Sequence, residues 1–460
     1  MIDDRPSALV YGLAITGLAT ARALAARGHR VIVADDVPTD ERRAFAAELG
    51  TDLIEQPDDA QIAALVGQVE LVAPSPGVPE THAVVRHALA AGVRIATELD
   101  LAYEWEQQRP GGPRPMIAIT GTDGKTTTTM MVASMLAAAG HRAAAVGNTE
   151  LPLVDAIDRD DVDVFAVECS SFRLSWLRSF RAEAAIWLNL AADHQNWHTS
   201  MASYEEAKAN VWRLQRPTDV AVAWADDPVV TARLRDAPGR AVTFGLQRGD
   251  YRTVTTARGV DLVGPTGVIC SSSRMRRTFP HDLSNALAAA AACIESGLVP
   301  VDRVGDGLAE FELPPHRIEP VGELDGVAWF NDSKATTPHA ALTAIRSFPS
   351  LVLIAGGRNK GLDLTPLASE PQRMRAVVAI GEAADDIAAA FTGTCPIERV
   401  TTTMADAVTA AAALARPGDA VLLSPACASF DWYPAGGYPA RGDDFRAQVR
   451  RLLAEREVHA

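Results

Sequence analysis

The stretch Ile117-Ala-Ile-Thr-Gly-Thr-Asp-Gly-Lys-Thr-Thr-Thr-Thr-Met130 decides the fold of the central part of the chain. An apolar run from Met116 predicts a short strand that ends at Thr120, and the residues from Thr126 onward predict a helix. Two glycines and a lysine lie between them, which predicts a turn at the helix N-terminus. Backbone amides and the positive end of a helix dipole meet a phosphate at such a turn. The stretch therefore predicts a nucleotide-phosphate site in an α/β domain.

The residues of this turn suit phosphate in different ways. Lys125 supplies a positive charge for the β- and γ-phosphates, and the Thr126 hydroxyl can bind Mg²⁺. Ile119 stands where the usual phosphate-loop pattern has its first glycine. A solvated glycine turn without a ligand is the alternative, which Gly-Lys-Thr between a strand and a helix disfavours. Four backbone amides are expected to wrap the phosphate oxygens: those of Gly121, Thr122, Asp123 and Gly124.

The composition is that of a soluble globular protein, with 48% hydrophobic and 22% charged residues among 460. A net charge of −15 argues against nucleic acid as a partner, because phosphate backbones need a basic surface. The five cysteines have no paired spacing, which favours a reducing compartment. Neither a signal peptide nor an apolar run of membrane length is visible. We therefore expect a cytoplasmic protein without membrane insertion.

Strand-like runs alternate with alanine- and leucine-rich helical stretches, a pattern typical of βαβ units and parallel sheets. Two proline-rich breaks, Arg109–Pro115 and Glu312–Arg317, interrupt this pattern. We expect three α/β domains, over residues 1–110, 111–313 and 314–460, each of ordinary domain size. The first and third are predicted to be Rossmann-like, and the second to be a P-loop ATPase-type domain.

The first segment reads as a strand, a glycine turn, a helix through Ala26 and a second strand that ends in two aspartates. This order predicts a Rossmann-like unit in which Asp35 or Asp36 accepts from a ribose hydroxyl. The glycine fingerprint is incomplete, because Ala14 stands where the middle glycine belongs. A turn without any ligand is an equally good interpretation of this motif alone. A second turn, Ala73–Val78, follows another strand at the same sheet edge.

Further strands of the central segment also end in polar residues. The run from Val162 ends at Glu168, whose carboxylate is well placed to hold Mg²⁺ beside Thr126. The strand from Ala185 leads to His194, although a lone histidine there is more often structural than a ligand. Lys208 falls in a helical stretch, and its spacing alone favours an exposed surface lysine.

Three strands of the third segment deliver polar turns at their carboxyl ends, where open α/β sheets bind ligands. Lysines follow two of these three strands, which indicates an anionic ligand, either a nucleotide phosphate or a substrate carboxylate. Solvated loops are the alternative. The three turns are Asn331–Thr336, Arg358–Lys360 and Ser424–Asp431.

Together, six motifs resemble the Mur ligases of peptidoglycan synthesis, and the resemblance covers essentially the whole chain. The last three motifs and the Rossmann-like first unit favour the branch of the family that adds glutamate. The loop that lacks its first glycine matches the family's own shorter version. The motifs are Thr120-Gly-Thr-Asp-Gly-Lys-Thr-Thr127, Glu168-Cys-Ser-Ser-Phe172, Asp193-His-x-x-x-His198, Asn331-Asp-Ser-Lys-Ala-Thr336, Gly356-Gly-x-x-Lys-Gly361 and Leu423-Ser-Pro-Ala-Cys-Ala-Ser-x-Asp431.

The resemblance implies an ATP-dependent ligase that adds D-glutamate to UDP-N-acetylmuramoyl-L-alanine through an acyl phosphate. This reaction belongs to cytoplasmic peptidoglycan precursor synthesis, and hence to cell wall biogenesis, cell shape and cell division. The resemblance also implies a monomer whose three domains bind the UDP-substrate, ATP and glutamate, in chain order. It implies two Mg²⁺ sites, and a carbamate on Lys208 because a cationic lysine cannot ligate a metal.

The site residues that the resemblance implies fall into five groups. The catalytic group is Lys125, Glu168, His194 and Lys208. The metal ligands are Thr126, Glu168, His194 and carbamylated Lys208. The ATP contacts are Gly121, Thr122, Asp123, Gly124, Lys125, Thr126, Thr127, Asn285, Arg317 (with His316 beside it) and Asp332. The UDP-substrate contacts are Ile15, Thr16, Asp35, Ser75, Gly77 and Asn148, and the glutamate contacts are Thr336, Lys360, Ser429 and Tyr438.

The chain departs from the family pattern at several positions. Asp123 and Asp282 each replace an asparagine, and the second change bears on the adenine contact. Asn196 stands where an aspartate is frequent, and Tyr438 where a phenylalanine is. The segment between Asp431 and Arg441 is two residues longer than the pattern.

Other classes of function remain open at this point. The first domain could serve an NAD-dependent oxidoreductase, although its incomplete fingerprint weighs against this. A nucleotide-sensing module would leave His194, Lys208 and the lysines of the third domain without a role. A ligase of the same family that adds a different amino acid is the closest rival. The residues do not distinguish D- from L-glutamate, since both carry the same charges.

Overall fold

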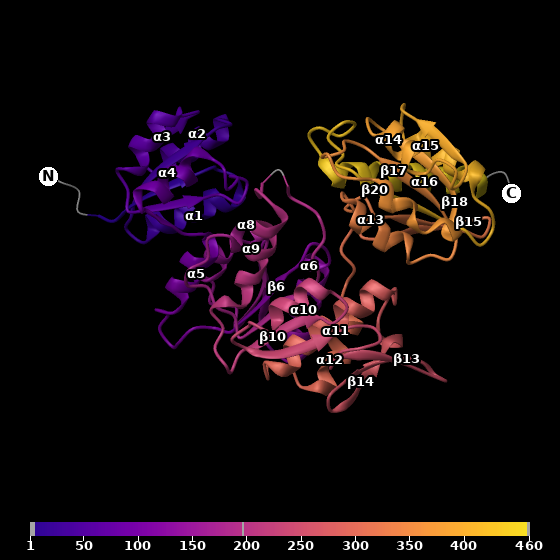
Figure 1. The fold of residues 1–460 in the computed structure, drawn as a ribbon, viewed down its shortest axis with the longest axis horizontal. Coiled ribbons are helices and arrows are strands. Elements are labelled where there is room, and N and C mark those ends of the chain that lie inside the picture. Colours follow the sequence, from indigo (N-terminus) through magenta and orange to yellow (C-terminus); the bar gives the residue numbers. More distant parts are fainter. Residues whose placement is uncertain (1–4, 196, 458–460) are drawn as a thin grey trace. The chain divides into compact units, whose positions relative to one another are not determined.

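The computed structural model describes residues 5–195 and 197–457 (Figure 1), so that Asn196 lies outside the described residues. The chain divides into two compact units, and the division falls between Phe311 and Glu312. All the sheets except one three-stranded meander are built mainly from parallel strands. The predicted α/β class is thereby confirmed, with two Rossmann-like sheets and, between them in the sequence, a P-loop-type sheet.

The first sheet has five parallel strands in the order β3-β2-β1-β4-β5. The chain first adds β2 and β3 on one side of β1 and then returns to add β4 and β5 on the other side. Doubly wound sheets bind their ligands at the point where the strand order changes in this way, here between β1 and β4. The strands are β1 (Ser7–Tyr11), β2 (Arg30–Asp35), β3 (Leu53–Glu55), β4 (Leu71–Pro74) and β5 (Arg94–Ile95). The helices are α1 (Ile15–Ala26), α2 (Asp40–Glu48), α3 (Asp59–Val66), α4 (Ala83–Ala91) and α5 (Glu98–Glu106).

The second sheet has six parallel strands in the order β11-β10-β9-β6-β8-β7. The strand that precedes the glycine-lysine turn, β6, lies inside the sheet, and all five of its residues are buried. The strands are β6 (Met116–Thr120), β7 (Ala143–Gly147), β8 (Val164–Glu168), β9 (Ala184–Trp187), β10 (Val220–Trp224) and β11 (Arg240–Phe244).

The helices of this region pack around the second sheet. The turn-bearing helix α6 contacts α11 and α12. A Cβ on Gly307 would lie 2.5 Å from the Cα of Met135, so this glycine permits the close approach of α12 to α6. The helices are α6 (Lys125–Ala138), α7 (Leu153–Ala156), α8 (Ser171–Leu174), α9 (Met201–Arg213), α10 (Pro228–Leu234), α11 (Pro280–Glu295) and α12 (Val301–Glu310).

A small antiparallel meander, which the sequence did not predict, is inserted between β11 and α11. Its edge strand β12 is largely exposed, and η1 (Ser272–Arg274) follows its last strand. The three strands are β12 (Arg252–Thr256), β13 (Gly259–Gly264) and β14 (Gly267–Ser271).

The first two sheets belong to one compact unit, although the break Arg109–Pro115 lies between them. The hydrophobic core runs through both, from Val10 in β1 to Ala118 in β6. A buried ion pair joins Arg114 to Glu106 of α5 across this break, and Arg114 also donates to carbonyls of the central part. The break is therefore irregular in structure but packed on both sides.

The second unit contains a six-stranded sheet in the order β15-β16-β20-β17-β18-β19, in which only β15 is antiparallel. The inner strands β17 and β20 are buried throughout. The strands are β15 (Glu319–Leu324), β16 (Val327–Asn331), β17 (Leu351–Gly356), β18 (Met374–Ile380), β19 (Ile397–Val400) and β20 (Ala420–Ala426). The helices are α13 (Pro338–Ile345), α14 (Ala384–Ala390), α15 (Met404–Leu414) and α16 (Gly437–Glu457), with short 3₁₀ turns η2 (Thr365–Ser369) and η3 (Pro371–Arg373).

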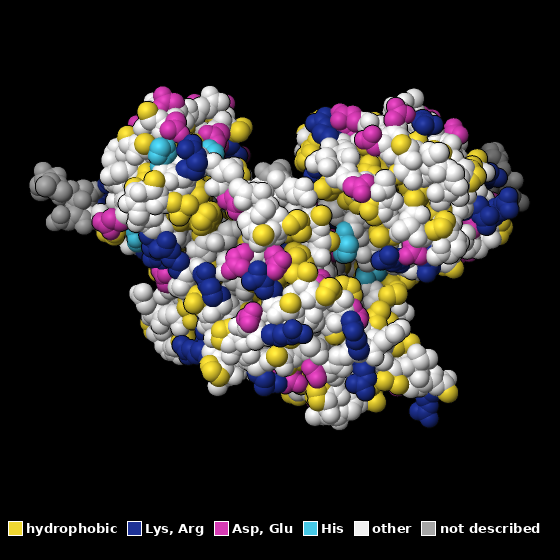
Figure 2. Space-filling model, in the orientation of Figure 1, with side chains coloured by type: hydrophobic (Ala, Val, Ile, Leu, Met, Phe, Trp, Pro, Cys, Tyr) yellow, Lys and Arg dark blue, Asp and Glu magenta, His cyan; other side chains and the backbone are white. Residues whose placement is uncertain are grey.

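Figure 2 shows Lys and Arg side chains interspersed with Asp and Glu side chains on the face drawn. No helix in the described part of the chain is both long and apolar enough to cross a membrane. All five cysteines are free thiols.

Candidate active site

The turn after β6 has the geometry of a phosphate site at its helix end. Gly124 adopts φ +86° and is the N-cap of α6, which has no side-chain cap. The first hydrogen bond of the helix runs from the Thr128 amide to the Gly124 carbonyl, so the first-turn amides lie ahead of the helical ladder. These amides and the helix dipole suit an anion.

Two of the four amides expected to wrap phosphate are already used within the protein. The amides of Thr122 and Asp123 both donate to the Asn189 side-chain oxygen, at 2.9 Å each. A Cβ on Gly121 (φ +155°) would lie 2.9 Å from the Cβ of Leu188, so the loop also packs closely on the segment after β9. In this structure, Asn189 therefore shapes the loop, and of the four expected amides it leaves those of Gly121 and Gly124 for phosphate.

Two lysines converge on one carbonyl of the loop. Lys125 Nζ donates to the Gly121 and Thr122 carbonyls at 2.8 and 2.7 Å. Lys208 Nζ, from α9, donates to the same Gly121 carbonyl at 2.7 Å. The expectation of an exposed surface lysine at position 208 is wrong, because α9 packs this side chain inward and leaves it 1% exposed. Burial, and next the charge of Lys125, holds the pKa of Lys208 well below its usual value.

Glu168 ends β8, next to β6 in the sheet, and is 2% exposed. Its Oε1 accepts from the Asn148 amide at 2.9 Å, and Asn148 follows the neighbouring strand β7. Its Oε2 is buried and accepts no hydrogen bond within the described residues. A buried carboxylate oxygen without a donor fits a cation at that position.

His194 lies on the segment after β9, on the other side of β6. Its backbone adopts φ +55°, and its Nε2 lies 3.3 Å from Asp193 Oδ2. Its ring packs edge-on against Phe172, with centroids 4.6 Å apart. Carboxyl ends of adjacent parallel strands thus bring the turn, Glu168 and the His194 segment to one sheet edge. No group of three or more His, Cys, Asp or Glu side chains that could hold a metal occurs among the described residues.

Asn285 of α11 lies beside the turn, because its Oδ1 would be 2.8 Å from a Cβ on Gly124. Asp282, one turn earlier, is fully buried and pairs with Arg277 through Nε and Nη2, at 2.7 Å each. Burial raises the pKa of Asp282, but hydrogen bonds from Arg277 and His281 outweigh it and lower that pKa overall. The aspartate therefore serves as a partner for Arg277 inside the protein.

The first sheet brings together the turn that follows β1 and the turn that follows β4, because these two strands are neighbours. Ile15 begins α1 and is 64% exposed, while Thr16 beside it is 9% exposed. Ser75 follows β4, and its amide donates to the Tyr11 carbonyl at 2.8 Å. A Cβ on Gly12 would lie 3.0 Å from the Ser75 Cβ, so the two turns are in close contact. Gly77, two residues later, has open space at its Cβ position.

The two aspartates that end β2 have different environments. Asp35 is 4% exposed, and its carboxylate accepts from the amides of Leu13 and Val37 and from Arg42. Asp36 is half-exposed and accepts from the Tyr11 hydroxyl at 2.6 Å, with His82 Nε2 at 3.1 Å. The Asp35 carboxylate thus holds the backbone of the turn after β1 through buried hydrogen bonds, and the Asp36 carboxylate faces solvent.

The second unit places its candidate nucleotide residues around the end of β16. His316 is 6% exposed and adopts φ +60°, next to Arg317, whose Nε is also buried. Asp332 is 3% exposed, and its two oxygens accept from the Ser424 hydroxyl and the Ile318 amide. Because β16 and β20 are neighbours in the sheet, the turns that follow them lie side by side.

The candidate glutamate residues come from four segments of the same unit: three turns that follow strands, and the start of α16, which carries Tyr438. Ser429 is buried, Lys360 is exposed, and Thr336 and Tyr438 are half-buried. The Tyr438 ring packs edge-on against His316, with centroids 6.1 Å apart. Sequence reasoning missed Arg441, which is 1% exposed and donates to Ser333 and to the Cys427 carbonyl. Burial lowers the pKa of Arg441 to about 10.

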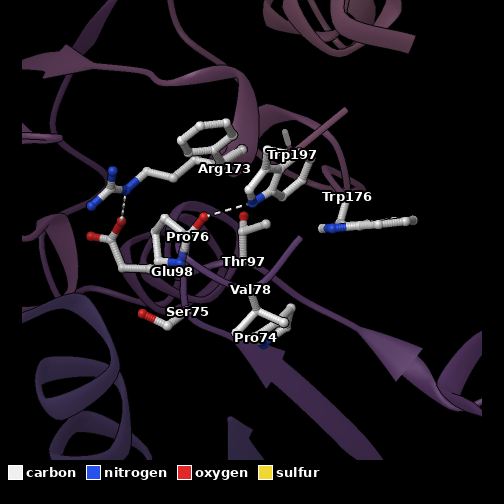
Figure 3. A pocket seen from close by; sticks show the side chains of 10 residues that line it. Pro74, Ser75, Pro76, Val78, Thr97, Glu98, Arg173, Trp176 and Trp197 are labelled. Carbon is white, nitrogen blue, oxygen red and sulfur yellow. Dashed lines mark hydrogen bonds and ion pairs between the residues drawn. The ribbon is translucent and has the colours of Figure 1, made fainter. Parts of the chain in front are cut away.

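A pocket in the first unit lies between the β4 turn and the segments after β8 and β9 (Figure 3). Phe172 and Trp197 stack within it, with centroids 4.7 Å apart, and Trp197 Nε1 donates to the Pro76 carbonyl. Arg173 and Glu98 form an ion pair on its wall. The sequence did not indicate Arg173 or Glu98 as site residues, because an ion pair between residues 75 positions apart leaves no local sequence pattern.

These features define the class of protein: an α/β nucleotide-dependent enzyme with a phosphate turn, a buried carboxylate and a buried lysine at one sheet edge. The sequence profile of the Mur ligase middle domain matches residues 119–293, and that of the Mur ligase glutamate ligase domain matches residues 316–427.

Curated relatives extend the match to nearly the whole chain. The UDP-N-acetylmuramoylalanine–D-glutamate ligase of Frankia casuarinae is 43% identical, over 96% of this chain and 93% of the relative. That of Streptomyces avermitilis is 38% identical, over 97% of this chain and 98% of the relative. The chain therefore belongs to the Mur ligase family, on the branch of the relatives that carry this name.

Solved structures share the fold at low sequence identity. The UDP-N-acetylmuramate-alanine ligase MurC of Thermotoga maritima matches 98% of this chain and 99% of its own, with a TM-score of 0.57 at 20% identity. MurF of Acinetobacter baumannii matches 97% of this chain and 92% of its own, with a TM-score of 0.58 at 16% identity. These likenesses support the three-domain architecture.

Proposed function

We propose that this protein is the ATP-dependent ligase that joins D-glutamate to UDP-N-acetylmuramoyl-L-alanine in the cytoplasm, acting as a monomer. The observation that carries the proposal is the 43% identity to a ligase of that name over 96% of the chain. Residues 1–110 would bind the UDP-substrate, residues 111–313 ATP, and residues 314–460 glutamate.

The reaction joins a carboxylate to an amine at the expense of ATP. The alanyl carboxylate oxygen attacks the γ-phosphorus, and ADP leaves with the electrons of the broken P–O bond. The glutamate amine then attacks the carbonyl of the acyl phosphate, loses a proton, and expels inorganic phosphate as the amide forms. Phosphoryl transfer of this kind depends mostly on positioning and on neutralising charge.

The phosphate turn would hold the nucleotide. The amides at the start of α6, from Gly124 to Thr127, suit the β- and γ-phosphates, and Lys125 would neutralise their charge. In this structure Lys125 donates to two loop carbonyls, so it would exchange these for phosphate oxygens. Asn285 beside Gly124 would contact the nucleotide from α11, and Arg317 and Asp332 from the second unit.

Thr126, Glu168, His194 and Lys208 would hold Mg²⁺, which supplies charge neutralisation at the transferred phosphoryl group. The unpartnered Glu168 oxygen supports this role. Carbamylation of Lys208 needs a neutral amine to attack CO₂, and the lowered pKa of Lys208 supports it. The carbamate would replace a buried amine by an anionic oxygen ligand close to Gly121.

The substrates would enter at the other turns. Ile15, Thr16, Ser75 and Gly77 would cradle the uridine diphosphate at the N-terminus of α1, with Asp35 holding the turn in shape. Asn148 would contact the acyl group. Thr336, Lys360, Ser429 and Tyr438 would receive glutamate, whose carboxylates suit the exposed Lys360.

Amino-acid-dependent phosphate release tests the proposal. With UDP-N-acetylmuramoyl-L-alanine and Mg-ATP present, we expect release when D-glutamate is added and little with L-glutamate, glycine or lysine. Preference for another amino acid would assign the chain to a different ligase of the family. No release with any amino acid would refute ligase activity.

A further inference from the structure

Arg173 is a buried cation at the junction of the first two sheets. It lies on α8, five residues after Glu168, and its side chain is 4% exposed. Its guanidinium reaches groups on three other elements. It donates to Thr16 Oγ1 on α1 at 2.7 Å, to Asn148 Oδ1 after β7 at 2.5 Å, and to Glu98 Oε2 on α5 at 3.3 Å.

These contacts complete a continuous chain of hydrogen bonds. Thr16 accepts from one arm of Arg173, and Asn148 accepts from the other. Asn148 in turn donates its amide hydrogen to Glu168 Oε1 at 2.9 Å. The chain therefore runs from the first turn of α1 to the carboxylate whose second oxygen has no donor. Under the proposed function, these are the uridine-diphosphate end and the phosphoryl-transfer end of one substrate site.

Glu98 holds the guanidinium of Arg173 at its Nε. Its Oε2 accepts from Arg173 Nε, and its Oε1 accepts from the Val154 amide at 3.1 Å, so the carboxylate is anchored on both sides. Figure 3 shows this pair on the wall of the pocket that Ser75 and Pro76 also line. With Nε held by Glu98, the two terminal nitrogens face Thr16 and Asn148, which a planar fork can do and an ammonium cannot.

We propose that Arg173 is a positioning residue that couples the two ends of the substrate site. This inference rests on the proposed function. Binding of the uridine diphosphate against Thr16 fixes the Thr16 hydroxyl, and the guanidinium passes that constraint to Asn148 and Glu168. Binding energy from the remote, unreactive end of the substrate is thereby used to align the acyl group for phosphoryl transfer.

The test compares Arg173→Gln with a matched control. Arg114 forms a similarly buried ion pair with Glu106 and contacts none of the candidate site residues, so Arg114→Gln reports merely structural loss. For each variant, kcat and KM are measured with UDP-N-acetylmuramoyl-L-alanine and with its fragment 1-phospho-N-acetylmuramoyl-L-alanine, which lacks uridine monophosphate. The Kd of UDP alone and the melting temperature are measured in parallel.

Coupling through Arg173 predicts a selective loss. In Arg173→Gln, kcat for the complete substrate falls about 100-fold, the cost of a small misplacement of reacting groups. The Kd of UDP and the kcat for the fragment change no more than in Arg114→Gln. Arg173→Lys, which keeps the charge without the fork, stays as slow as Arg173→Gln; it also serves as the second variant if glutamine prevents folding.

Three results would overturn the proposal. Full kcat in Arg173→Lys would show that charge alone is needed. A weaker Kd for UDP with unchanged kcat would make Arg173 a direct anion contact. Equal kcat losses in the Arg173 and Arg114 variants would make it structural. Wild-type protein that is inactive with the complete substrate and D-glutamate would instead defeat the proposed function itself, which separates the two failures.

Discussion

Replacing Lys208 by methionine should abolish ligation and leave the fold intact. The lysine is 1% exposed and makes one hydrogen bond among the described residues, to the Gly121 carbonyl. That carbonyl also accepts from Lys125 at 2.8 Å, so it keeps a partner in the variant. Methionine is one heavy atom shorter and uncharged, and it removes a buried amine whose charged form is disfavoured by burial, so the variant should be at least as stable as the wild type.

The expected loss of activity is much larger than any change in stability. Methionine cannot be carbamylated and cannot supply an anionic oxygen to Mg²⁺. Removing a single electrostatic contact to a transition state typically costs about 10²–10³ in kcat. Because both a metal ligand and its charge are lost, kcat should fall by at least about 10³-fold.

The assay measures phosphate release at saturating substrates, together with urea unfolding of each variant. Lys208→Ala extends the test, because it leaves space where three methylenes and an amine were. Formate or acetate at millimolar concentration should restore part of the activity of Lys208→Ala and none of the activity of Lys208→Met, in which the space is filled. Chloride at equal ionic strength is the control.

Full activity of Lys208→Met, in buffer free of added carboxylates, would refute the carbamate. Equal rescue of both variants would show that the added anion acts elsewhere. A variant that is inactive and also unfolded at low urea would show instead that Lys208 serves the fold.

Three further predictions follow from the same sheet edge. Glu168→Gln should lose most of the stabilisation that Mg-ATP gives. With Mg-ATP at 100 times its wild-type Kd, the free energy of unfolding of the wild type rises by about 2.7 kcal/mol, whereas that of a variant with a 100-fold weaker site rises by about 0.4 kcal/mol. An equal thermal shift in both proteins would exclude Glu168 as a metal ligand. Gly121→Ala should be inactive, because the new Cβ would lie 2.9 Å from Leu188 at φ +155°; wild-type phosphate release would show that the loop yields. Since burial lowers the folded-state pKa of Lys208, the unfolded state binds the extra proton, and the contribution of Lys208 to stability should rise with pH up to the unfolded pKa, about 10.5. Lys208→Met lacks this dependence. Without bicarbonate, its free energy of unfolding in urea should therefore exceed that of the wild type at pH 7, and the difference should shrink towards pH 10. A difference that stays constant with pH would contradict the lowered pKa.

The sequence predicted those parts of the fold that rest on local pattern. The strand Met116–Thr120 and the helix through Ala26 occur as expected, because apolar periodicity and glycine turns act over a few residues. The meander from Arg252 to Ser271 was missed, since its exposed edge strand carries no apolar alternation. The strand that the sequence placed from Ala185 occurs as Ala184–Trp187.

Long-range packing decided what the sequence could not show. The spacing of Lys208 favoured an exposed residue, whereas α9 turns its side chain towards the phosphate turn. The amides of Thr122 and Asp123 were expected to face phosphate, but Asn189, some 66 positions away, accepts from both. Asp35 and Asp36 are equivalent by spacing and differ because Arg42 and two amides surround only the first.

The central claim is that an acyl phosphate of the UDP-substrate reacts with D-glutamate. It is tested most directly with substrate carrying ¹⁸O in both oxygens of the alanyl carboxylate. Attack of that carboxylate on ATP, followed by amide formation, predicts one ¹⁸O atom in each inorganic phosphate, with release dependent on D-glutamate. Unlabelled phosphate, or labelled phosphate formed equally without D-glutamate, would contradict the account.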